Sequence, residues 1–182
     1  IKTGPWIFWD NLEQSMRKAA DLGFDAIELF TASGNAIETE TLKVLLNQYK
    51  LALAAVGTGA GKVIHGLTLT DPNSSIRENA IVFIKEMMEF GAAFNAPAII
   101  GSMQGNVAQG CIHGQSIDIL AEGLHVLDEH ATSLGVKLIY EPLNRYETNL
   151  MNNLDDAAAF IESNKFKNVV LLADLFHMNI EE

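Results

Sequence analysis

Two stretches decide the predicted fold: residues 138–147, LIYEPLNRYE, and residues 171–182, LLADLFHMNIEE. Each begins with a short aliphatic run that predicts a buried strand, and a carboxylate ends each run, Glu141 in the first and Asp174 in the second. If the two strands are parallel neighbours, their carboxyl ends meet at the same rim, so the two acids lie close together. A hard divalent cation would then bridge them, within reach of a sugar-like substrate.

The rest of the chain alternates predicted strands with amphipathic helices. Strands are expected at residues 1–3, 24–29, 51–56, 98–101, 136–141 and 169–174. Such alternation demands right-handed crossovers and a parallel sheet covered by helices. Because no linker, charge block or low-complexity segment divides the chain, residues 1–182 are expected to belong to a single domain.

Local signals indicate where helices begin and where loops lie. The pairs Asp10/Glu13 and Ser75/Glu78 have the spacing of capping boxes, and Asn153 is a further candidate cap. Two segments, GTGAGKVIHG at residues 57–66 and SMQGNVAQGCIHG at residues 102–114, contain several glycines. Both are predicted to be irregular loops.

The loops favour a barrel over a doubly wound fold. A nucleotide-binding doubly wound fold favours a tight glycine turn after its first strand. In this chain the first loop is instead aromatic, with Trp6, Phe8 and Trp9, and the GTGAG run lacks the full nucleotide-binding fingerprint. The candidate ligand acids also follow the last two predicted strands, as in sites at the carboxyl face of a barrel.

Composition excludes several classes of protein. The 182 residues are 48% hydrophobic and carry a formal charge of -11, a field that repels nucleic acid and anionic membranes. No apolar run approaches the roughly 20 residues of a membrane-spanning helix. Cys111 is the sole cysteine, so no internal disulfide forms, and a cytoplasmic location is predicted.

The motif EPLNRYE followed by LADLFHMNIEE resembles the tagatose and psicose 3-epimerases, within the wider xylose-isomerase-like barrels. The spacing carries the resemblance: Glu147 follows Glu141 by six residues, and His177 follows Asp174 by three. The resemblance implies an α/β fold, a (β/α)8 TIM barrel of which this chain covers about the first six βα units. It also implies that a further ligand His and a second catalytic Glu lie beyond residue 182, and it allows a homo-oligomer.

The resemblance assigns roles to individual residues. Glu141 and Asp174 are expected to bind a divalent metal ion, with Glu141 also acting as a catalytic base. Carboxylates with an imidazole suit Mn²⁺ first, with Mg²⁺ or Co²⁺ as alternatives. Glu147 and His177 match residues that hold the substrate's oxygens.

Structural alternatives stand beside several of these roles. Trp6 and Trp9 would form an apolar wall against the carbon face of a sugar, but packing under the barrel rim is equally consistent with the sequence. Glu141 would otherwise form a salt bridge with Arg145 or a lysine. Arg145 is expected to pair with a nearby acid rather than with a phosphate. Glu28, at the end of a predicted strand, faces the same rim and is expected to support the site rather than to react.

The combined prediction is a metal-dependent ketose 3-epimerase or isomerase that acts on a small sugar by proton transfer through an enediolate. The alternatives are a hydroxypyruvate isomerase, an inosose dehydratase or isomerase, and a catalytically silent sugar-binding barrel, which a fold alone never excludes. A phosphodiester hydrolase similar to endonuclease IV is disfavoured. That branch uses three zinc ions, many histidines and basic loops, whereas this chain has five histidines and a charge of -11.

Overall fold

The computed structural model describes residue 8 and residues 11–182, so the first predicted strand, residues 1–3, lies outside the described part. The described strands are β1 (Ala26–Phe30), β2 (Ala52–Gly57), β3 (Ala98–Ile100), β4 (Leu138–Tyr140) and β5 (Val169–Leu171). They form one sheet in which each strand pairs in parallel with the next along the chain. This unbroken order is that of a barrel wall, because a doubly wound sheet reverses its strand order at a switch point.

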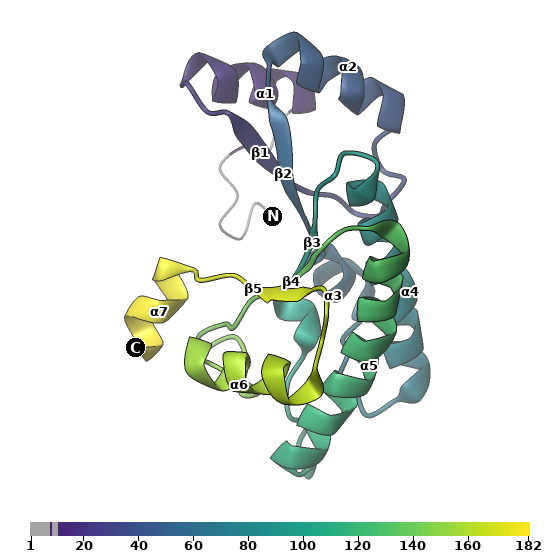
Figure 1. The fold of residues 1–182 in the computed structure, drawn as a ribbon, viewed down its shortest axis with the longest axis vertical. Helices are drawn as coiled ribbons and strands as arrows, with labels where there is room; N and C mark the ends of the chain where they lie inside the picture. Colours follow the sequence, from purple (N-terminus) through teal and green to yellow (C-terminus); the bar gives the residue numbers. More distant parts are fainter. Residues whose placement is uncertain (1–7, 9–10) are drawn as a thin grey trace.

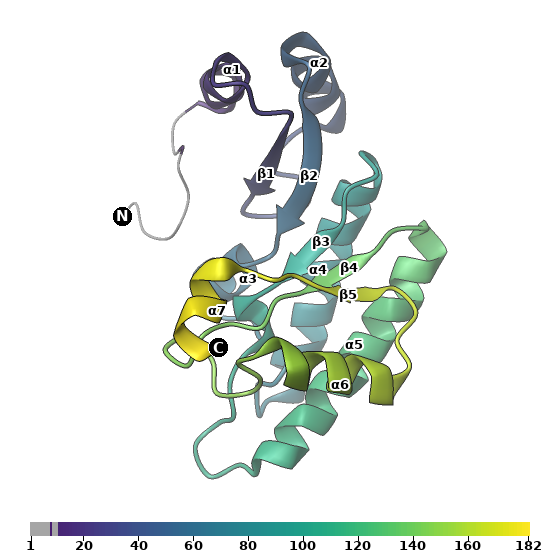
Figure 2. The ribbon, with the colours of Figure 1, turned by 60° about the vertical axis from the view of Figure 1, so that its left-hand side comes forward.

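Helices connect the strands. They are α1 (Leu12–Asp21), α2 (Thr39–Tyr49), α3 (Ala60–His65), α4 (Ser74–Ala92), α5 (His113–Leu134), α6 (Leu154–Asn164) and α7 (Leu175–Glu181), with a 3-10 turn η1 (Ser102–Gln104) after β3. The strands change direction steadily from β1 to β5, and α4 and α5 run side by side (Figure 1). Figure 2 shows the short helix α7 beyond the carboxyl end of β5. None of the described helices is both long and apolar enough to cross a membrane.

The core lies between the middle strands and the pair α4 and α5. The strands contribute side chains that are almost wholly buried, among them Val56, Ile100 and Leu138. Parallel strands covered by helices read as continuous apolar runs, which is the pattern that predicted them. On α5, Leu120, Leu124 and Leu127 recur at helical spacing and are all fully buried, so one apolar stripe faces the sheet.

The helix caps differ in part from the prediction. Asn11, not Asp10, caps α1, and Asn73, not Ser75, caps α4 by accepting the backbone N–H of Ser75. Asparagine caps as well as serine or aspartate does, so Asn11, one residue after Asp10, and Asn73, two residues before Ser75, can take the role. The predicted cap of α6, Asn153, is confirmed.

The prediction that residues 57–66 form an irregular loop was wrong, because α3 occupies Ala60–His65. The glycine within it serves close packing. A Cβ atom at Gly61 would overlap the side chain of Met103 and would lie 2.9 Å from a ring carbon of Phe83. Glycine here therefore lets a short helix approach η1 and α4 closely, a role that composition does not separate from loop flexibility.

Two helical glycines provide a matched test of this packing. A Cβ at Gly91 in α4 would lie 2.6 Å from the backbone oxygen of Ala96. At Gly123 in α5 it would meet only side-chain methyl groups, Leu69 Cδ2 at 3.4 Å and Ile81 Cδ1 at 4.0 Å. We expect Gly91→Ala to destabilise the protein by about 1–3 kcal/mol through overpacking. Gly123→Ala should be neutral or stabilise it by up to about 1 kcal/mol through helix propensity. Urea unfolding of the full-length protein measures both effects. Equal unfolding midpoints for the two variants would contradict the prediction that Gly91 is packed more closely than Gly123.

Candidate active site

Three of the predicted site side chains converge at the carboxyl end of the sheet. Glu141, Asp174 and His177 each offer one potential ligand atom, and these atoms lie within 4.8 Å of one another. The His177 Nε2 atom is 3.8 Å from Glu141 Oε1 and 3.9 Å from Asp174 Oδ2. Glu141 directly follows β4, while the other two residues belong to the start of α7. The structure thus brings the two acids together.

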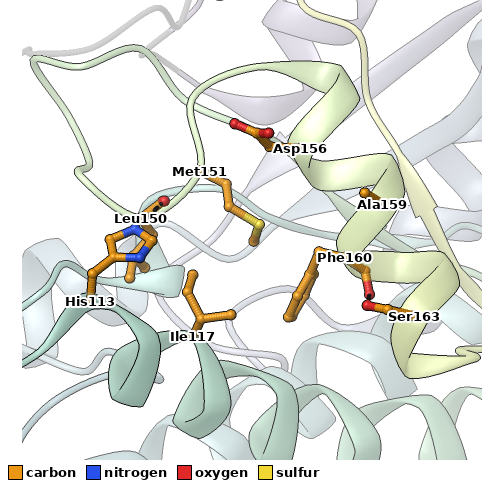
Figure 3. A pocket seen from close by; sticks show the side chains of 8 residues that line it. All are labelled: His113, Ile117, Leu150, Met151, Asp156, Ala159, Phe160 and Ser163. Carbon is orange, nitrogen blue, oxygen red and sulfur yellow. Dashed lines mark hydrogen bonds between the residues drawn. The ribbon is translucent and has the colours of Figure 1, made fainter.

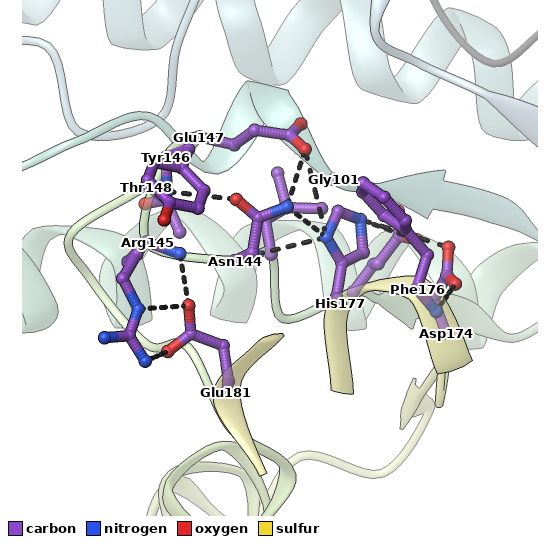
Figure 4. Close-up of polar contacts among 12 residues, drawn as sticks. Gly101, Asn144, Arg145, Tyr146, Glu147, Thr148, Asp174, Phe176, His177 and Glu181 are labelled. Carbon is purple, nitrogen blue, oxygen red and sulfur yellow. Dashed lines mark hydrogen bonds and ion pairs between the residues drawn. The ribbon is translucent and has the colours of Figure 1, made fainter. Parts of the chain in front are cut away.

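Asp174 reaches this cluster by a different route from the one predicted. The strand expected at residues 169–174 ends at Leu171, and Asp174 is instead the N-cap of α7. Its Oδ1 atom accepts the backbone N–H of Phe176 at 2.7 Å. The capping bond orients the carboxylate, and the first helical turn places His177, three residues later, on the same side (Figure 4).

The carboxylate of Glu141 lies against the bare backbone of Gly101. The Glu141 side chain is 16% exposed, and its backbone N–H donates to the carbonyl of Ile100 at 3.0 Å. A Cβ atom at Gly101 would lie 2.7 Å from Glu141 Oε2. The missing side chain at the end of β3 therefore makes room for the carboxylate at the end of β4.

His177 presents an N–H group to the two acids. Its ring is buried, and Nδ1 accepts the backbone N–H of Asn144 at 3.2 Å. The Asn144 side-chain nitrogen lies 2.8 Å from the same atom (Figure 4). Because a backbone N–H only donates, Nδ1 carries the lone pair, and the neutral ring has its proton on Nε2. That tautomer suits hydrogen bonding to an oxygen better than binding a metal ion.

Asn144 is the residue of this network that the sequence analysis missed. Its side chain is buried, its Oδ1 accepts the backbone N–H of Tyr146 at 3.0 Å, and its Nδ2 donates to Glu147 Oε1 at 3.0 Å. The Tyr146 bond fixes which end of the amide faces His177. Glu147 thereby joins the site through Asn144, although its own side chain is 45% exposed. A polar residue three positions after the strand-ending acid was the available signal.

Several carboxylates gather around Glu141 with no lysine or arginine paired to it among the described residues. Burial, followed by the charges of Asp174, Glu28 and Glu147, raises the pKa of Glu141 to about 7. Partial burial and the charge of Asp174 also raise the pKa of Glu28, so this β1 residue feels the same cluster. Within the described residues, neither Glu141 nor Asp174 forms an ion pair with a lysine or arginine.

The alternative of a Glu141–Arg145 salt bridge was wrong. Arg145 binds Glu181 instead, with Nη2 2.8 Å from Oε2 and Nε 2.9 Å from Oε1. The expectation that this arginine pairs with a nearby acid is confirmed. A divalent cation would offset the charges that remain, so the carboxylates of Glu141 and Asp174 fit such an ion, and their oxygen donors suit Mn²⁺ or Mg²⁺.

The predicted tryptophan wall and one cavity remain to be compared with this cluster. Trp6 and Trp9 lie outside the described residues, so their wall against the sugar stays a prediction. A cavity of about 550 Å³ opens between α5, α6 and the loop before α6 (Figure 3). Its lining includes Ile117, Met151 and Phe160, and none of its lining residues belongs to the acidic cluster. The cavity is therefore separate from the acidic cluster.

The raised pKa of Glu141 predicts how pH changes stability. A folded pKa near 7, above the usual 4.5, means that the folded state holds this proton more tightly than the unfolded state does. The stabilisation is complete below about pH 4.5 and is lost as pH rises through 7. Glu141→Gln should therefore gain stability over wild type as pH rises from 5 to 8. Urea unfolding with EDTA measures this, and a constant difference across that range would contradict the raised pKa.

Comparison with known proteins places the chain in a family. The family model for xylose isomerase-like TIM barrels matches residues 16–182. Over 186 residues, the chain is 27% identical to 3-dehydro-D-guloside 4-epimerase of Escherichia coli (strain K12), with 96% of this chain and 68% of that protein covered. It is 26% identical over 191 residues to D-psicose 3-epimerase of Agrobacterium fabrum (strain C58 / ATCC 33970), with 100% and 61% covered.

Solved structures show the same fold. The E. coli 3-keto-D-glucoside 4-epimerase superposes with a TM-score of 0.79 at 23% identity, over 98% of this chain and 69% of that one. A D-psicose 3-epimerase crystallised in the presence of D-fructose gives 0.77 at 23% identity, over 95% and 61%. The chain thus spans about two thirds of the length of these relatives. It belongs to the xylose isomerase-like TIM barrel family, which confirms the predicted resemblance and the partial (β/α)8 barrel.

Proposed function

We propose that the full-length protein is a divalent-metal-dependent sugar epimerase, acting at the carbon next to a ketose carbonyl by proton transfer. The observation that carries the proposal is the convergence of Glu141, Asp174 and His177 at one rim without a strong cationic partner among the described residues. The printed activities of the matched relatives, which are sugar epimerases, support it at the level of the family.

Glu141 and Asp174 would hold the metal, with Mn²⁺ as the first candidate and Mg²⁺ or Co²⁺ as alternatives. When bound, such an ion acidifies the C–H between a carbonyl and a hydroxyl group and stabilises the negative charge that develops on their oxygens. The ligand His and the second catalytic Glu expected beyond residue 182 remain part of the proposal.

The chain's own side chains divide the proton chemistry. Glu141 takes the proton from the substrate carbon, and a pKa near 7 suits a carboxylate that must both accept and release a proton at neutral pH. His177 donates its Nε2 hydrogen to a substrate oxygen, in the tautomer that Asn144 fixes. Glu147, which is partly exposed beside Asn144, accepts a hydroxyl proton of the sugar.

The proposed substrate is an uncharged sugar. Both the Nε and Nη2 atoms of Arg145 bind Glu181, so this guanidinium is not free to bind a phosphate. The acids of the rim would also repel an anionic substrate. Trp6 and Trp9 would supply the apolar face. The cytoplasmic location and the homo-oligomer stay predictions.

The metal assignment is tested by removing one anionic ligand at a time. Glu141→Gln and Asp174→Asn should each weaken Mn²⁺ binding to the full-length protein by tenfold or more, because each takes a charge from a hard cation. Glu40→Gln on α2, which removes an 84% exposed acid, should leave the affinity unchanged. Isothermal titration calorimetry measures all three. Wild-type affinity in both site variants would remove the basis for this metal site.

The proton-transfer chemistry is tested in D₂O. Ketoses turned over by the full-length enzyme with Mn²⁺ should gain deuterium at the carbon that changes configuration, because the abstracted proton exchanges with solvent on a partly exposed glutamate. Glu141→Gln should lower this exchange by a factor of about 100 or more. NMR of the products follows the label. Turnover without deuterium would indicate hydride transfer, and binding with neither turnover nor exchange would indicate a silent barrel.

A further inference from the structure

A buried glutamine binds the backbone next to the acidic cluster. Gln104 is the last residue of η1, and no part of its side chain is exposed. Its Nε2 atom donates to the carbonyl oxygens of Gly101 and Glu141, each at 3.0 Å. One amide therefore connects the residue that follows β3 with the acid that follows β4.

The amide acts where the sheet ends. The ladder between β3 and β4 reaches only the pair Ile100 and Tyr140, after which β3 turns into η1. The carbonyl of Glu141 thus lies one residue beyond the last paired position. A buried carbonyl without a partner costs about 1–3 kcal/mol, and Gln104 supplies the missing donor. The side chain extends the connection between the two strands by one step.

The hydrogen atoms of this network have one arrangement. Carbonyl oxygens only accept, so the nitrogen of the Gln104 amide must face Gly101 and Glu141. The Tyr140 hydroxyl then donates to Gln104 Oε1, at 2.6 Å. Burial raises the pKa of Tyr140, so its hydroxyl keeps its proton at neutral pH. Both donors and the acceptor of the amide are used, which holds it in a single orientation.

We infer that Gln104 is a positioning residue that fixes the direction of the Glu141 side chain. The backbone of Glu141 is held on both sides, by its N–H to Ile100 and by its C=O to Gln104. Its carboxylate therefore leaves a fixed backbone toward Asp174 and lies over Gly101. Functional groups need such support, because a misplacement of about 1 Å is enough to impair a site. The inference rests on the proposed function in that Glu141 is the reacting carboxylate.

The test compares Gln104 with a buried residue far from Glu141. Gln104→Met keeps the length of the side chain and removes both donors, and Tyr140→Phe removes only the hydroxyl. The control is Asp128→Ala, because buried Asp128 accepts the backbone N–H groups of Lys167 and Asn168 before β5 begins. Three properties of the full-length protein are measured: Tm, Mn²⁺ affinity by calorimetry, and the visible absorption spectrum of the Co²⁺-loaded form.

We expect Gln104→Met to weaken Mn²⁺ binding by tenfold or more, a loss of affinity typical of replacing residues that orient metal ligands. The Co²⁺ absorption bands should shift as well. Tyr140→Phe should give a smaller loss. Asp128→Ala should lower Tm while it keeps wild-type affinity and bands. Wild-type affinity and bands in Gln104→Met, or equal losses in Asp128→Ala, would show that Gln104 only stabilises the fold. If Gln104→Met does not fold, Gln104→Glu replaces it under the same criteria.

The inference and the proposed function can fail separately. If the wild-type protein binds no divalent metal, the proposed function fails. Amide hydrogen exchange at Glu141 then decides the inference without a metal. Faster exchange in Gln104→Met than in Asp128→Ala supports positioning by Gln104, and equal rates overturn it.

Discussion

The repulsion between carboxylates at one rim is the constraint on which the site depends. The ligand atoms of Glu141 and Asp174 lie within 4.8 Å of each other, and the charges of Asp174, Glu28 and Glu147 all raise the pKa of Glu141. Partly buried charges of one sign cost several kcal/mol unless they take up a proton or a cation. The rest of the fold must therefore hold these groups against their own repulsion. A bound divalent cation would offset this repulsion between the carboxylates.

The barrel wall supplies the rigidity. Parallel strands deliver their carboxyl ends to one edge, and the core between the sheet, α4 and α5 fixes where each strand stops. Local backbone features at that edge then determine where the two carboxylates lie. Gly101 leaves space for one carboxylate, and the N-cap of α7 turns the other toward it. The apolar core thus sets the position of the rim, and backbone hydrogen bonds set the direction of each side chain on it.

The sequence predicted what depends on periodicity and missed what depends on packing. Short apolar runs between amphipathic helices located the described strands, and the rule for parallel strand ends predicted that Glu141 lies near Asp174. Helix α3 was missed because its glycine serves close contact and not flexibility. Gln104 lies in a glycine-rich segment that was predicted to be an irregular loop, yet it is fully buried. Two of its three side-chain partners, Tyr140 and Glu141, are 36 and 37 residues away along the chain, a relation that no local pattern records.

The two βα units that build the site are also joined by polar contacts outside the core. Glu181 of α7 accepts from the backbone and guanidinium of Arg145, while the next residue, Glu182, accepts the first backbone N–H of α6. Exposed ion pairs add little stability, but a two-pronged arginine contact fixes orientation. The contact sets the distance between Asn144, next to Arg145, and His177, one helical turn before Glu181. Glu181 and Glu182 therefore hold α7, the helix that carries His177, against the loop after β4 and the start of α6.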